Sequence, residues 1–358
     1  MSGELKLRSL HVTTDDHCTQ IEKSVALETP ITIRVNGYAF ATLFATPSQQ
    51  KQLALGHLLG EGIIRSQEEV SGVDVKESEV DVTVLGNVSK RLEAAHTFKV
   101  QTTACGSTSD YYKVLDESGT PAVNSSFYTT PEHIATMVTA LTQRSLLRKD
   151  RIAVHAAGLF SDDKMTAYAE DAGRHNTVDK ILGEAMERGI DFAKSVIVTT
   201  GRQASDMVLK AARAGVPITV AMRGALYSGI FVAWRTNLTL VAHAHRSSME
   251  IYTYPERVLT HSTRKESAPV NVSALGDSVQ TVLKPQRILD LRHLLCPALL
   301  QQLTETVQNI NVGETVEVIT ADPLTLVDVP AWASRERQQI IRTQDDWLTI
   351  RFFVRRET

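Results

Sequence analysis

The chain has 358 residues, of which 42% are hydrophobic and 22% are charged, and its formal net charge is −3. This length suits two or three domains of roughly 100–200 residues each. The charge balance gives no basic surface of the kind that nucleic-acid binding needs, and no apolar stretch approaches the roughly 18 residues of a membrane span. We therefore expect no nucleic-acid partner and no membrane partner.

Cysteine is rare, and its three positions are Cys18, Cys105 and Cys296. A small, odd number of cysteines argues against a framework of disulfides. The N-terminus also lacks the apolar core of a signal peptide. These features together predict a cytoplasmic protein whose thiols stay reduced.

The first residues are polar, and we expect residues 1–20 to form a loose segment before a globular domain over residues 21–260. This domain opens with a predicted β-hairpin, because two alternating segments, residues 31–35 and 38–44, flank Asn36-Gly37. An Asn-Gly pair supplies the two positive φ angles of a type I′ turn.

Two helices are predicted before residue 150. Pro47 fits the first turn of one helix, which ends at Gly60 or two residues later. Thr130-Pro131 begins the other helix with a capping side chain and a proline at the first position. The apolar residues of this second helix share one face; they are Ile134, Met137, Val138 and Leu141.

Strands and helices alternate from Arg151 to Ala244. The predicted strands are Val196–Val198, Pro217–Met222 and Leu238–Ala242, and the predicted helices are Thr177–Arg188, Ala204–Ala214 and Ala225–Trp234. Short apolar strands separated by helices are typical of a sheet that is covered on both faces. We therefore expect an α/β fold for this part of the chain.

The alternation breaks at residues 261–284, which are rich in polar residues and are predicted to be a linker. Residues 285–358 are predicted to form a small α+β domain. Its expected elements are strands Arg287–Leu291, Thr315–Thr320 and Trp347–Val354, helix Pro297–Asn309 and a short helix after Asp322-Pro323.

Cys296 precedes Pro297, and proline is favoured at the first helical position, so Cys296 is predicted to be an N-cap residue. A thiolate at this position faces free backbone N–H groups and the positive end of the helix dipole, which lower the pKa of a cysteine. The thiolate is the form that attacks and accepts sulfur. The local sequence allows a small buried apolar residue equally well.

Cys105 is followed by Gly106, Ser107 and Thr108. The glycine lets the backbone approach a partner, and the hydroxyl groups can donate hydrogen bonds to a sulfur anion. The local sequence alone nevertheless favours a loop cysteine without a chemical role, and a reactive thiol is the alternative.

His155 and the segment from Glu170 to Asn176 form a third concentration of polar groups. Asp171, Arg174, His175 and Asn176 come just before a predicted helix, where they would bind a phosphate or position an acid or a base. The simpler alternative is that Asn176 caps the helix and that Arg174 pairs with Glu170 or Asp171.

The sequence lacks the motifs of zinc sites and of common hydrolases. A zinc deaminase needs His-x-Glu followed by Pro-Cys-x-x-Cys, whereas His155 is followed by Ala156 and Ala157. No two cysteines are close enough in sequence for a zinc knuckle, and neither a Gly-x-Ser-x-Gly elbow nor a Walker loop is present. We expect no zinc, and a zinc deaminase stays a minor alternative.

The order of the segments resembles the FdhD family, the sulfur carriers that formate dehydrogenase needs for activity. The matching segments are Glu28 to Ile31, Asn36-Gly37, Leu53 to Ile64, His155 to Ala157, Glu170 to Lys180, Gly201-Arg202, Met207-Val208, Lys210 to Pro217 and Ile251 to Thr253. The resemblance implies a fold similar to cytidine deaminases, with a mixed sheet covered by helices but without zinc.

This resemblance also assigns residues. The family usually carries Cys-x-x-Cys where this chain has Cys105 and Thr108, and Arg223 to Leu226 replace its Ser-Ala-Pro-Thr stretch. A basic, glycine-rich segment of the family is implicated in holding the guanine-bearing molybdenum cofactor. That segment falls on His243, Ala244, His245, Arg246, Ser247 and Ser248, which are therefore the predicted binding residues for the molybdenum bis-guanine-dinucleotide cofactor. Only Arg246 keeps a fixed positive charge among them.

The chain from about Gln286 resembles the TusA family of small sulfur-relay proteins, which implies a two-layer α+β fold. The matching segments are Leu289 to Arg292, Cys296-Pro297, Gly313 to Thr315, Asp322-Pro323 and Asp328 to Pro330. In that family the cysteine before the proline carries a persulfide, and this role maps onto Cys296. Leu299 stands near the place of the family's usual second proline.

The two resemblances together predict a sulfur relay within one chain, with Cys105 and Cys296 as its catalytic residues. A cysteine desulfurase would load Cys296, Cys296 would pass its outer sulfur to Cys105, and Cys105 would deliver it to the cofactor of the formate dehydrogenase catalytic subunit. The family's habit also suggests a homodimer. The alternative is a chaperone that holds the cofactor or the apoenzyme and moves no sulfur.

Overall fold

The structure is a computed structural model of the whole chain. It describes residues 4–15, 17–97, 122–145, 153–260, 285–292, 294, 298–322, 325–345 and 349–358. The chain divides into two compact units, Met1–Lys265 and Glu266–Thr358. The predicted linker, residues 261–284, lies outside the described residues.

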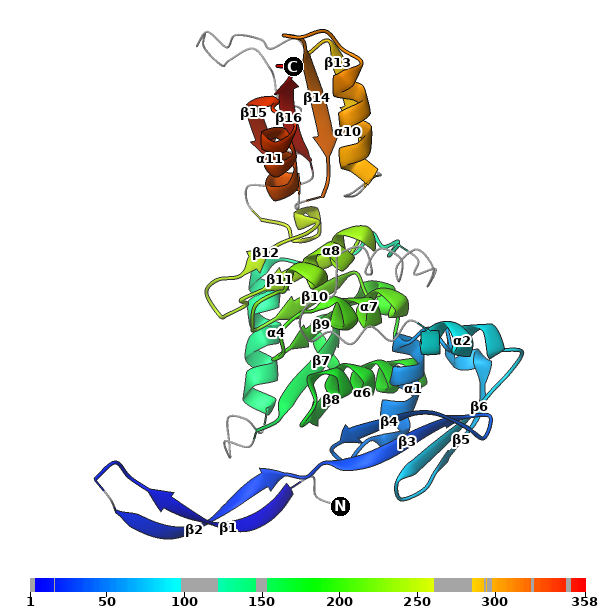
Figure 1. The fold of residues 1–358 in the computed structure, drawn as a ribbon. Coiled ribbons are helices and arrows are strands. Elements are labelled where there is room, and N and C mark those ends of the chain that lie inside the picture. Colours follow the sequence, from blue (N-terminus) through cyan, green and yellow to red (C-terminus); the bar gives the residue numbers. More distant parts are fainter. Residues whose placement is uncertain are drawn as a thin grey trace. The chain divides into compact units, whose positions relative to one another are not determined.

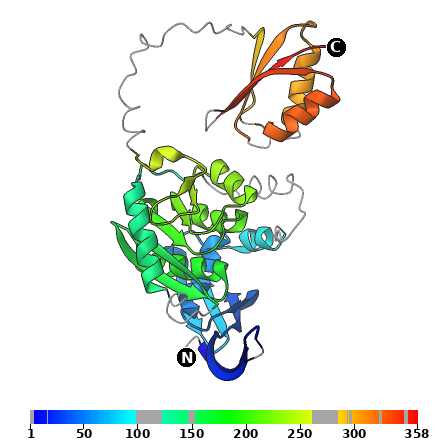
Figure 2. The ribbon, with the colours of Figure 1, turned by 90° about the vertical axis from the view of Figure 1, so that its left-hand side faces the viewer.

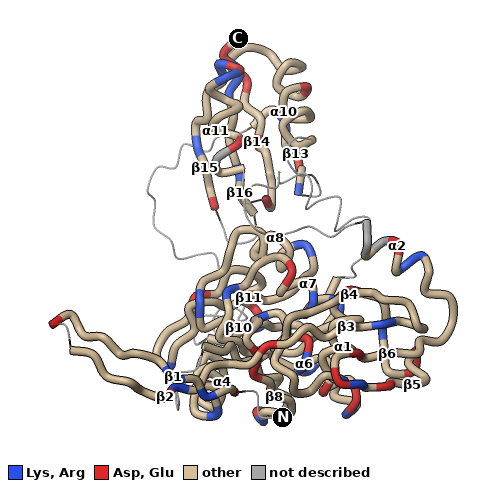
Figure 3. The backbone as a smooth tube through the Cα atoms, turned by 60° about the horizontal axis from the view of Figure 1, so that its bottom comes forward, with Lys and Arg blue, Asp and Glu red and all other residues tan. Residues whose placement is uncertain are grey.

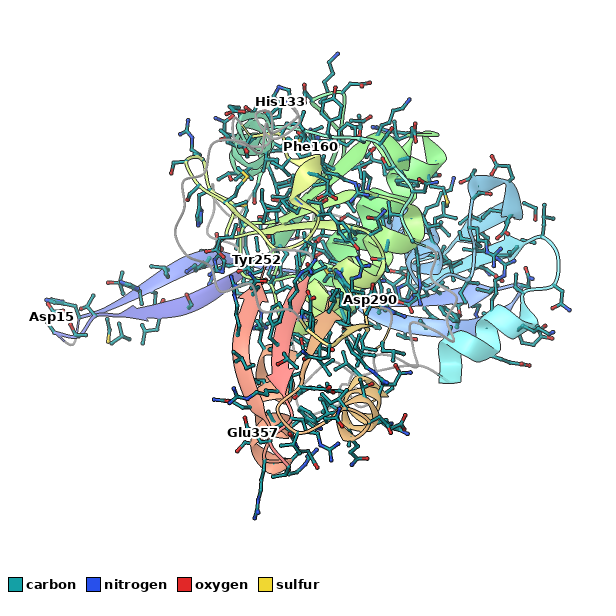
Figure 4. The ribbon with its side chains drawn as sticks, turned by 90° about the horizontal axis from the view of Figure 1, so that it is seen from above. Asp15, His133, Phe160, Tyr252, Asp290 and Glu357 are labelled. Atoms are coloured by element: carbon teal, nitrogen blue, oxygen red, sulfur yellow. The ribbon has the colours of Figure 1, made fainter. Side chains whose placement is uncertain are left out.

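The first unit begins with an antiparallel hairpin of two strands, β1 (Glu4–Val12) and β2 (Cys18–Ala26). Asp15 lies at its tip (Figure 4). The chain here differs from the loose segment expected over residues 1–20, because the alternation Leu5-Lys6-Leu7-Arg8 is a strand pattern that the polar composition obscured.

A four-stranded sheet follows, with the strand order β4-β3-β6-β5. Its strands are β3 (Thr29–Val35), β4 (Tyr38–Ala45), β5 (Val70–Val75) and β6 (Glu79–Val84). The predicted Asn36-Gly37 turn is confirmed, since both residues have positive φ angles, 52° and 83°, and Val35 pairs with Tyr38. The helices of this region are α1 (Gln50–Gly60), α2 (Ser89–Thr97) and the short 3-10 turn Gln67–Glu69.

A six-stranded mixed sheet forms the centre of the unit, with the order β12-β11-β10-β9-β7-β8 (Figure 1). Its strands are β7 (His155–Ser161), β8 (Lys164–Asp171), β9 (Ser195–Thr199), β10 (Ile218–Ala221), β11 (Thr239–Ala242) and β12 (Glu250–Ile251). β9, β10 and β11 are parallel, and the other pairs are antiparallel. The prediction of an α/β unit with a mixed sheet is confirmed.

Helices cover both faces of this sheet. α4 (Pro131–Arg144) packs its predicted apolar face, Ile134, Met137, Val138 and Leu141, into a core with the strands. Thr130 caps it as predicted, because its side chain accepts a hydrogen bond from the His133 N–H. The other face carries α6 (Arg174–Glu187), α7 (Ser205–Ala214) and α8 (Tyr227–Arg235) (Figures 1 and 2). The 3-10 turns Phe192–Lys194 and Pro255–Arg257 complete the unit.

Two helices of this unit touch through their backbones. A Cβ on Gly56 of α1 would lie 1.7 Å from the Asp179 carbonyl oxygen of α6. A Cβ on Gly183 of α6 would lie 2.0 Å from the Gln52 carbonyl oxygen of α1. Any side chain at either glycine would push the helices apart, so both positions need glycine for packing and not for backbone freedom.

The second unit is a small α+β domain, as predicted. Its four-stranded sheet has the order β13-β14-β16-β15. Its elements are β13 (Arg287–Asp290), α10 (Ala298–Gln308), β14 (Thr315–Thr320), α11 (Thr325–Arg335), β15 (Gln339–Asp345) and β16 (Ile350–Arg355). The Trp332 indole N–H of α11 donates to Thr304 Oγ1 of α10 at 2.8 Å, so a partly buried hydrogen bond joins the two helices beside the core.

Among the residues that the structure describes, no helix combines the length and the apolar character that crossing a membrane requires.

Candidate functional site

Most of the polar residues that were predicted from the sequence to be functional lie at one edge of the six-stranded sheet. β8, β9, β10 and β11 all point towards this edge, and β7 starts there at His155. The loops that follow these strands span residues 172–173, 200–204, 222–226 and 243–249. The carboxyl ends of strands are where open α/β sheets bind their ligands.

Main-chain hydrogen bonds tie these loops to each other. They join Thr200 N–H to the Ala156 carbonyl at 3.0 Å, Met222 N–H to Thr199 at 2.9 Å, Gln203 N–H to Gly224 at 3.2 Å and His243 N–H to Arg223 at 3.0 Å. The loops are therefore held as one surface, which a ligand meets already formed.

This surface is rich in positive charge. Its loops and the starts of the adjoining elements carry four arginines that supply this charge, Arg174, Arg202, Arg223 and Arg246, beside four histidines, His155, His175, His243 and His245. His175 has an acidic neighbour, because its Nε2 lies 2.7 Å from Asp206 Oδ2. Within the described parts of the chain, none of the four arginines is ion-paired with a carboxylate. The edge is therefore suited to an anionic ligand.

His155 shows that two of these arginines converge. Burial lowers the pKa of the half-buried imidazole, and the nearby charges of Arg174 and Arg223 lower it further. His155 is therefore neutral at pH 7, and its Nδ1 lies 3.4 Å from Thr200 Oγ1. Arg174 and Arg223 come from different loops, so only the fold brings their charges to one imidazole.

The loops at this edge contain an unpartnered buried donor and two glycines with tight contacts. The Arg174 Nε atom is buried and has no hydrogen-bond partner among the described residues. A Cβ on Gly201 would lie 3.2 Å from Arg174 Cβ, and a Cβ on Gly224 would lie 3.0 Å from His243 Nε2. His243 itself has a left-handed φ of 47°. A buried donor without a partner is rare in folded proteins.

The six residues predicted to hold the cofactor begin directly after β11. Ala244 is fully buried, and its N–H donates to the Ala221 carbonyl at 3.0 Å, so it supports the loop and does not face a ligand. The other five residues, His243, His245, Arg246, Ser247 and Ser248, are exposed. His245 N–H donates to the Ser248 carbonyl at 2.8 Å, which closes this segment into a turn. Their role as ligand contacts stays a prediction.

The predicted catalytic residues Cys105 and Cys296 lie outside the described residues, as does Thr108. Cys18 is a free, exposed cysteine at the start of β2. In the described segments, no group of three or more His, Cys, Asp or Glu side chains is arranged to hold a metal ion.

The simpler alternative for the Glu170–Asn176 segment is wrong on two points. α6 begins at Arg174 with Gly173 as its N-cap, three residues before the predicted start. Asn176 lies in the first turn and donates from Nδ2 to Asp171 Oδ1 at 2.9 Å. The Asp171 carboxylate pairs with Lys180 at 2.7 Å and not with Arg174.

Lys180 is a residue that the sequence reasoning missed. A signal was present, because Asn176, Lys180 and Gly183 recur at the helical spacing of one face. A lysine on the same face as a glycine that packs against a neighbouring helix indicates a buried lysine with an acidic partner.

Residues 26–259 match the FdhD/NarQ family, and residues 287–356 match the sulfurtransferase TusA family. Because the first match spans more than half of the chain, the chain belongs to the FdhD/NarQ family. It carries a TusA domain behind the family domain. Both matches place the chain among proteins that carry or transfer sulfur.

Relatives support this assignment. The sulfur carrier protein FdhD of Staphylococcus haemolyticus is 30% identical over 241 residues, which cover 67% of this chain and 91% of the relative. The sulfur carrier protein FdhD of Bacillus subtilis is 30% identical over 241 residues, which cover 67% of this chain and 92% of the relative. The crystal structure of a formate dehydrogenase accessory protein from Desulfotalea psychrophila aligns with a TM-score of 0.57 and 26% identity, covering 72% of this chain and 99% of that one.

Proposed function

We propose that this protein takes persulfide sulfur from a cysteine desulfurase and delivers it to the molybdenum bis-guanine-dinucleotide cofactor for the catalytic subunit of formate dehydrogenase, in the cytoplasm. The observation that carries the proposal is the unpaired positive charge at the carboxyl edge of the sheet, centred on Arg174 and Arg223. The cofactor is the acceptor substrate, and its phosphate groups match this charge. The names of the relatives support the sulfur cargo and the client enzyme.

The transfer between the two cysteines is a thiol exchange. The Cys105 thiolate attacks the outer sulfur of the Cys296 persulfide, a new S–S bond forms at Cys105, and Cys296 leaves as a thiolate. No oxidant or reductant is consumed, because one disulfide-type bond replaces another. A donor in the same chain raises its effective concentration near the acceptor to roughly millimolar when the linker is flexible.

Persulfide mapping tests this proposal. The full-length protein is incubated with a cysteine desulfurase and L-cysteine, and the persulfide on each cysteine is quantified by mass spectrometry after alkylation. We expect label on Cys296 and Cys105 in the wild type, none on Cys105 in Cys296→Ala, and retained label on Cys296 in Cys105→Ala. Both variants are expected to lower formate dehydrogenase maturation.

Cys18→Ala is the matched control, because Cys18 is an exposed free cysteine away from both families' motifs. It is expected to leave both labels and maturation unchanged. The relay would be contradicted if neither Cys105 nor Cys296 carried a persulfide and both alanine variants supported full formate dehydrogenase maturation. That result would favour the chaperone alternative.

We also propose that the protein is a homodimer in which the β1–β2 hairpin contacts the second copy. Five apolar side chains of the hairpin each expose more than a third of their surface; they are Leu5, Leu7, Leu10, Val12 and Val25. A two-stranded hairpin is only marginally stable in water by itself. The tip of the hairpin is acidic (Figure 3), and the apolar positions of the hairpin need a covering surface.

Replacing Leu5 and Leu7 together by glutamate is therefore expected to shift the dimer to monomer, because four charges would enter a twofold interface. Light scattering coupled to gel filtration measures the mass. Ser24→Glu with Lys6→Gln changes the charge by the same two units per copy on the face of the hairpin opposite Leu5 and Leu7, where Ser24 and Lys6 pair with each other. An unchanged dimer with glutamates at Leu5 and Leu7 would exclude this interface.

A further inference from the structure

The end of β8 is fixed by one buried carboxylate. Asp171 is completely buried and accepts four hydrogen bonds. Its Oδ2 accepts from Lys180 Nζ at 2.7 Å and from the Thr46 N–H at 3.0 Å. Its Oδ1 accepts from the Gly173 N–H at 2.8 Å and from Asn176 Nδ2 at 2.9 Å. We call Asp171, Lys180 and Asn176 the Asp171 brace.

The brace joins the start of α6 to the end of β4. Lys180 Nζ also donates to the Thr46 carbonyl at 3.0 Å, and Asn176 Nδ2 also donates to the Phe44 carbonyl at 2.9 Å. Lys180 is completely buried, so its ammonium group has no access to water. The pair of Lys180 and Asp171 is therefore made inside the protein, where a lost partner leaves a charge uncompensated.

This arrangement fixes the position of the first two residues of α6, Arg174 and His175. Gly173 is the N-cap and offers no side chain to fix the helix start. The bond from Gly173 N–H to Asp171 takes over that task. The side chains of Arg174 and His175 then reach the positively charged edge, where Arg174 packs against Gly201 and His175 meets Asp206.

We propose that Asp171 and Lys180 are positioning residues that hold Arg174 and His175 in the geometry that binds the anionic part of the ligand. The inference rests on the proposed function, because it assumes that this edge binds a guanine-bearing phosphate ligand. In metal sites, removing a group that orients a ligating side chain commonly lowers affinity by about 10-fold to 100-fold, and we expect a loss of the same order here.

The same helix provides a matched control. Asp179 is 1% exposed and belongs to a second buried network. It accepts from Lys210 Nζ at 2.7 Å and pairs with His57 Nδ1 at 3.0 Å. These partners lie on α7 and α1, away from the start of α6. Asp179→Asn therefore disturbs a buried carboxylate of equal burial without touching the bonds that fix Arg174.

The test is calorimetric titration of the full-length protein with GDP, the fragment that represents the nucleotide end of the cofactor. We expect Asp171→Asn and Lys180→Met to weaken GDP binding about 10-fold or more, Arg174→Gln to weaken it as a direct-contact reference, and Asp179→Asn to stay within about twofold of the wild type. Thermal unfolding of each variant is measured alongside.

Asp171→Asn with Lys180→Met removes both charges together, and serves if a single variant does not fold. Wild-type affinity in the Asp171 and Lys180 variants, or an equal loss in Asp179→Asn, would overturn the positioning role while leaving the ligand site intact. A wild-type protein that binds no GDP would overturn the ligand site itself and this inference with it.

Discussion

Gly56→Ala is expected to destabilise the protein by at least about 3 kcal/mol, because overpacking in a rigid contact is costly. The new Cβ would lie 1.7 Å from the Asp179 carbonyl oxygen and 2.8 Å from the Gly183 nitrogen. Both are backbone atoms inside a helix, so neither can turn away as a flexible side chain would. The helices α1 and α6 would have to separate, which also strains the buried network of His57, Asp179 and Lys210.

Denaturant unfolding followed by circular dichroism measures the effect. Gly72→Ala is the control, because a Cβ there would meet its nearest atom, Thr83 Oγ1, at an ordinary 3.8 Å. We expect that variant to stay within about 0.5 kcal/mol of the wild type. A Gly56→Ala protein as stable as Gly72→Ala would mean that α1 and α6 do not meet at this point.

Elements with local signals were predictable from the sequence. The Asn36-Gly37 turn, the Thr130 cap and the end of α7 at Gly215 each depend on the conformation of one or two residues. Gly215 adopts a φ of 83° as the residue that ends α7. Such features follow from steric preferences of single residues, so a sequence suffices to locate them.

Other features depend on residues far apart in the chain. The Arg174 charge is left unpaired because Asp171 bonds to Lys180 and to Thr46, and Thr46 is 125 positions away from Asp171. No local pattern specifies that choice. β15 was missed for a related reason: Gln339–Asp345 is mostly polar and has weak alternation, and its pairing with β16 includes a bulge between Ile340 and Arg342.

α6 connects the separate findings on packing and on binding. Its first residues face the positively charged edge, its Asp179 and Lys180 enter two buried networks, and its Gly183 touches α1. Charged binding residues at the start of a helix need rigid support from the fold, because binding groups must be held within fractions of an ångström of their working positions. The many buried polar groups on this helix therefore serve the geometry of the edge as well as the stability of the unit.

Lys210→Met is expected to cost about 3–5 kcal/mol, because removing one partner of a buried ion pair leaves the other charge uncompensated. Lys210 Nζ lies 2.7 Å from Asp179 Oδ1 and 3.3 Å from Glu61 Oε1. Burial works to raise the pKa of Asp179, but Lys210 and His57 hold it below its usual value of 3.8. In the wild type, the stability contributed by ionised Asp179 is thus present above pH 3.8 and lost as the pH falls through the lower folded value.

In Lys210→Met we expect burial, the largest influence on Asp179, to outweigh the remaining effect of His57, so that the pKa of Asp179 in the folded variant rises above its unfolded value. The folded variant then takes up a proton as the pH falls, and its deficit relative to the wild type shrinks. We expect urea unfolding to show a smaller deficit at pH 5 than at pH 8. Lys51→Met is the control, because Lys51 pairs with Glu187 at 2.6 Å while 46% exposed, and it should cost no more than about 1 kcal/mol. A deficit that matches the Lys51 variant, or one that does not change with pH, would contradict a buried pair at Asp179.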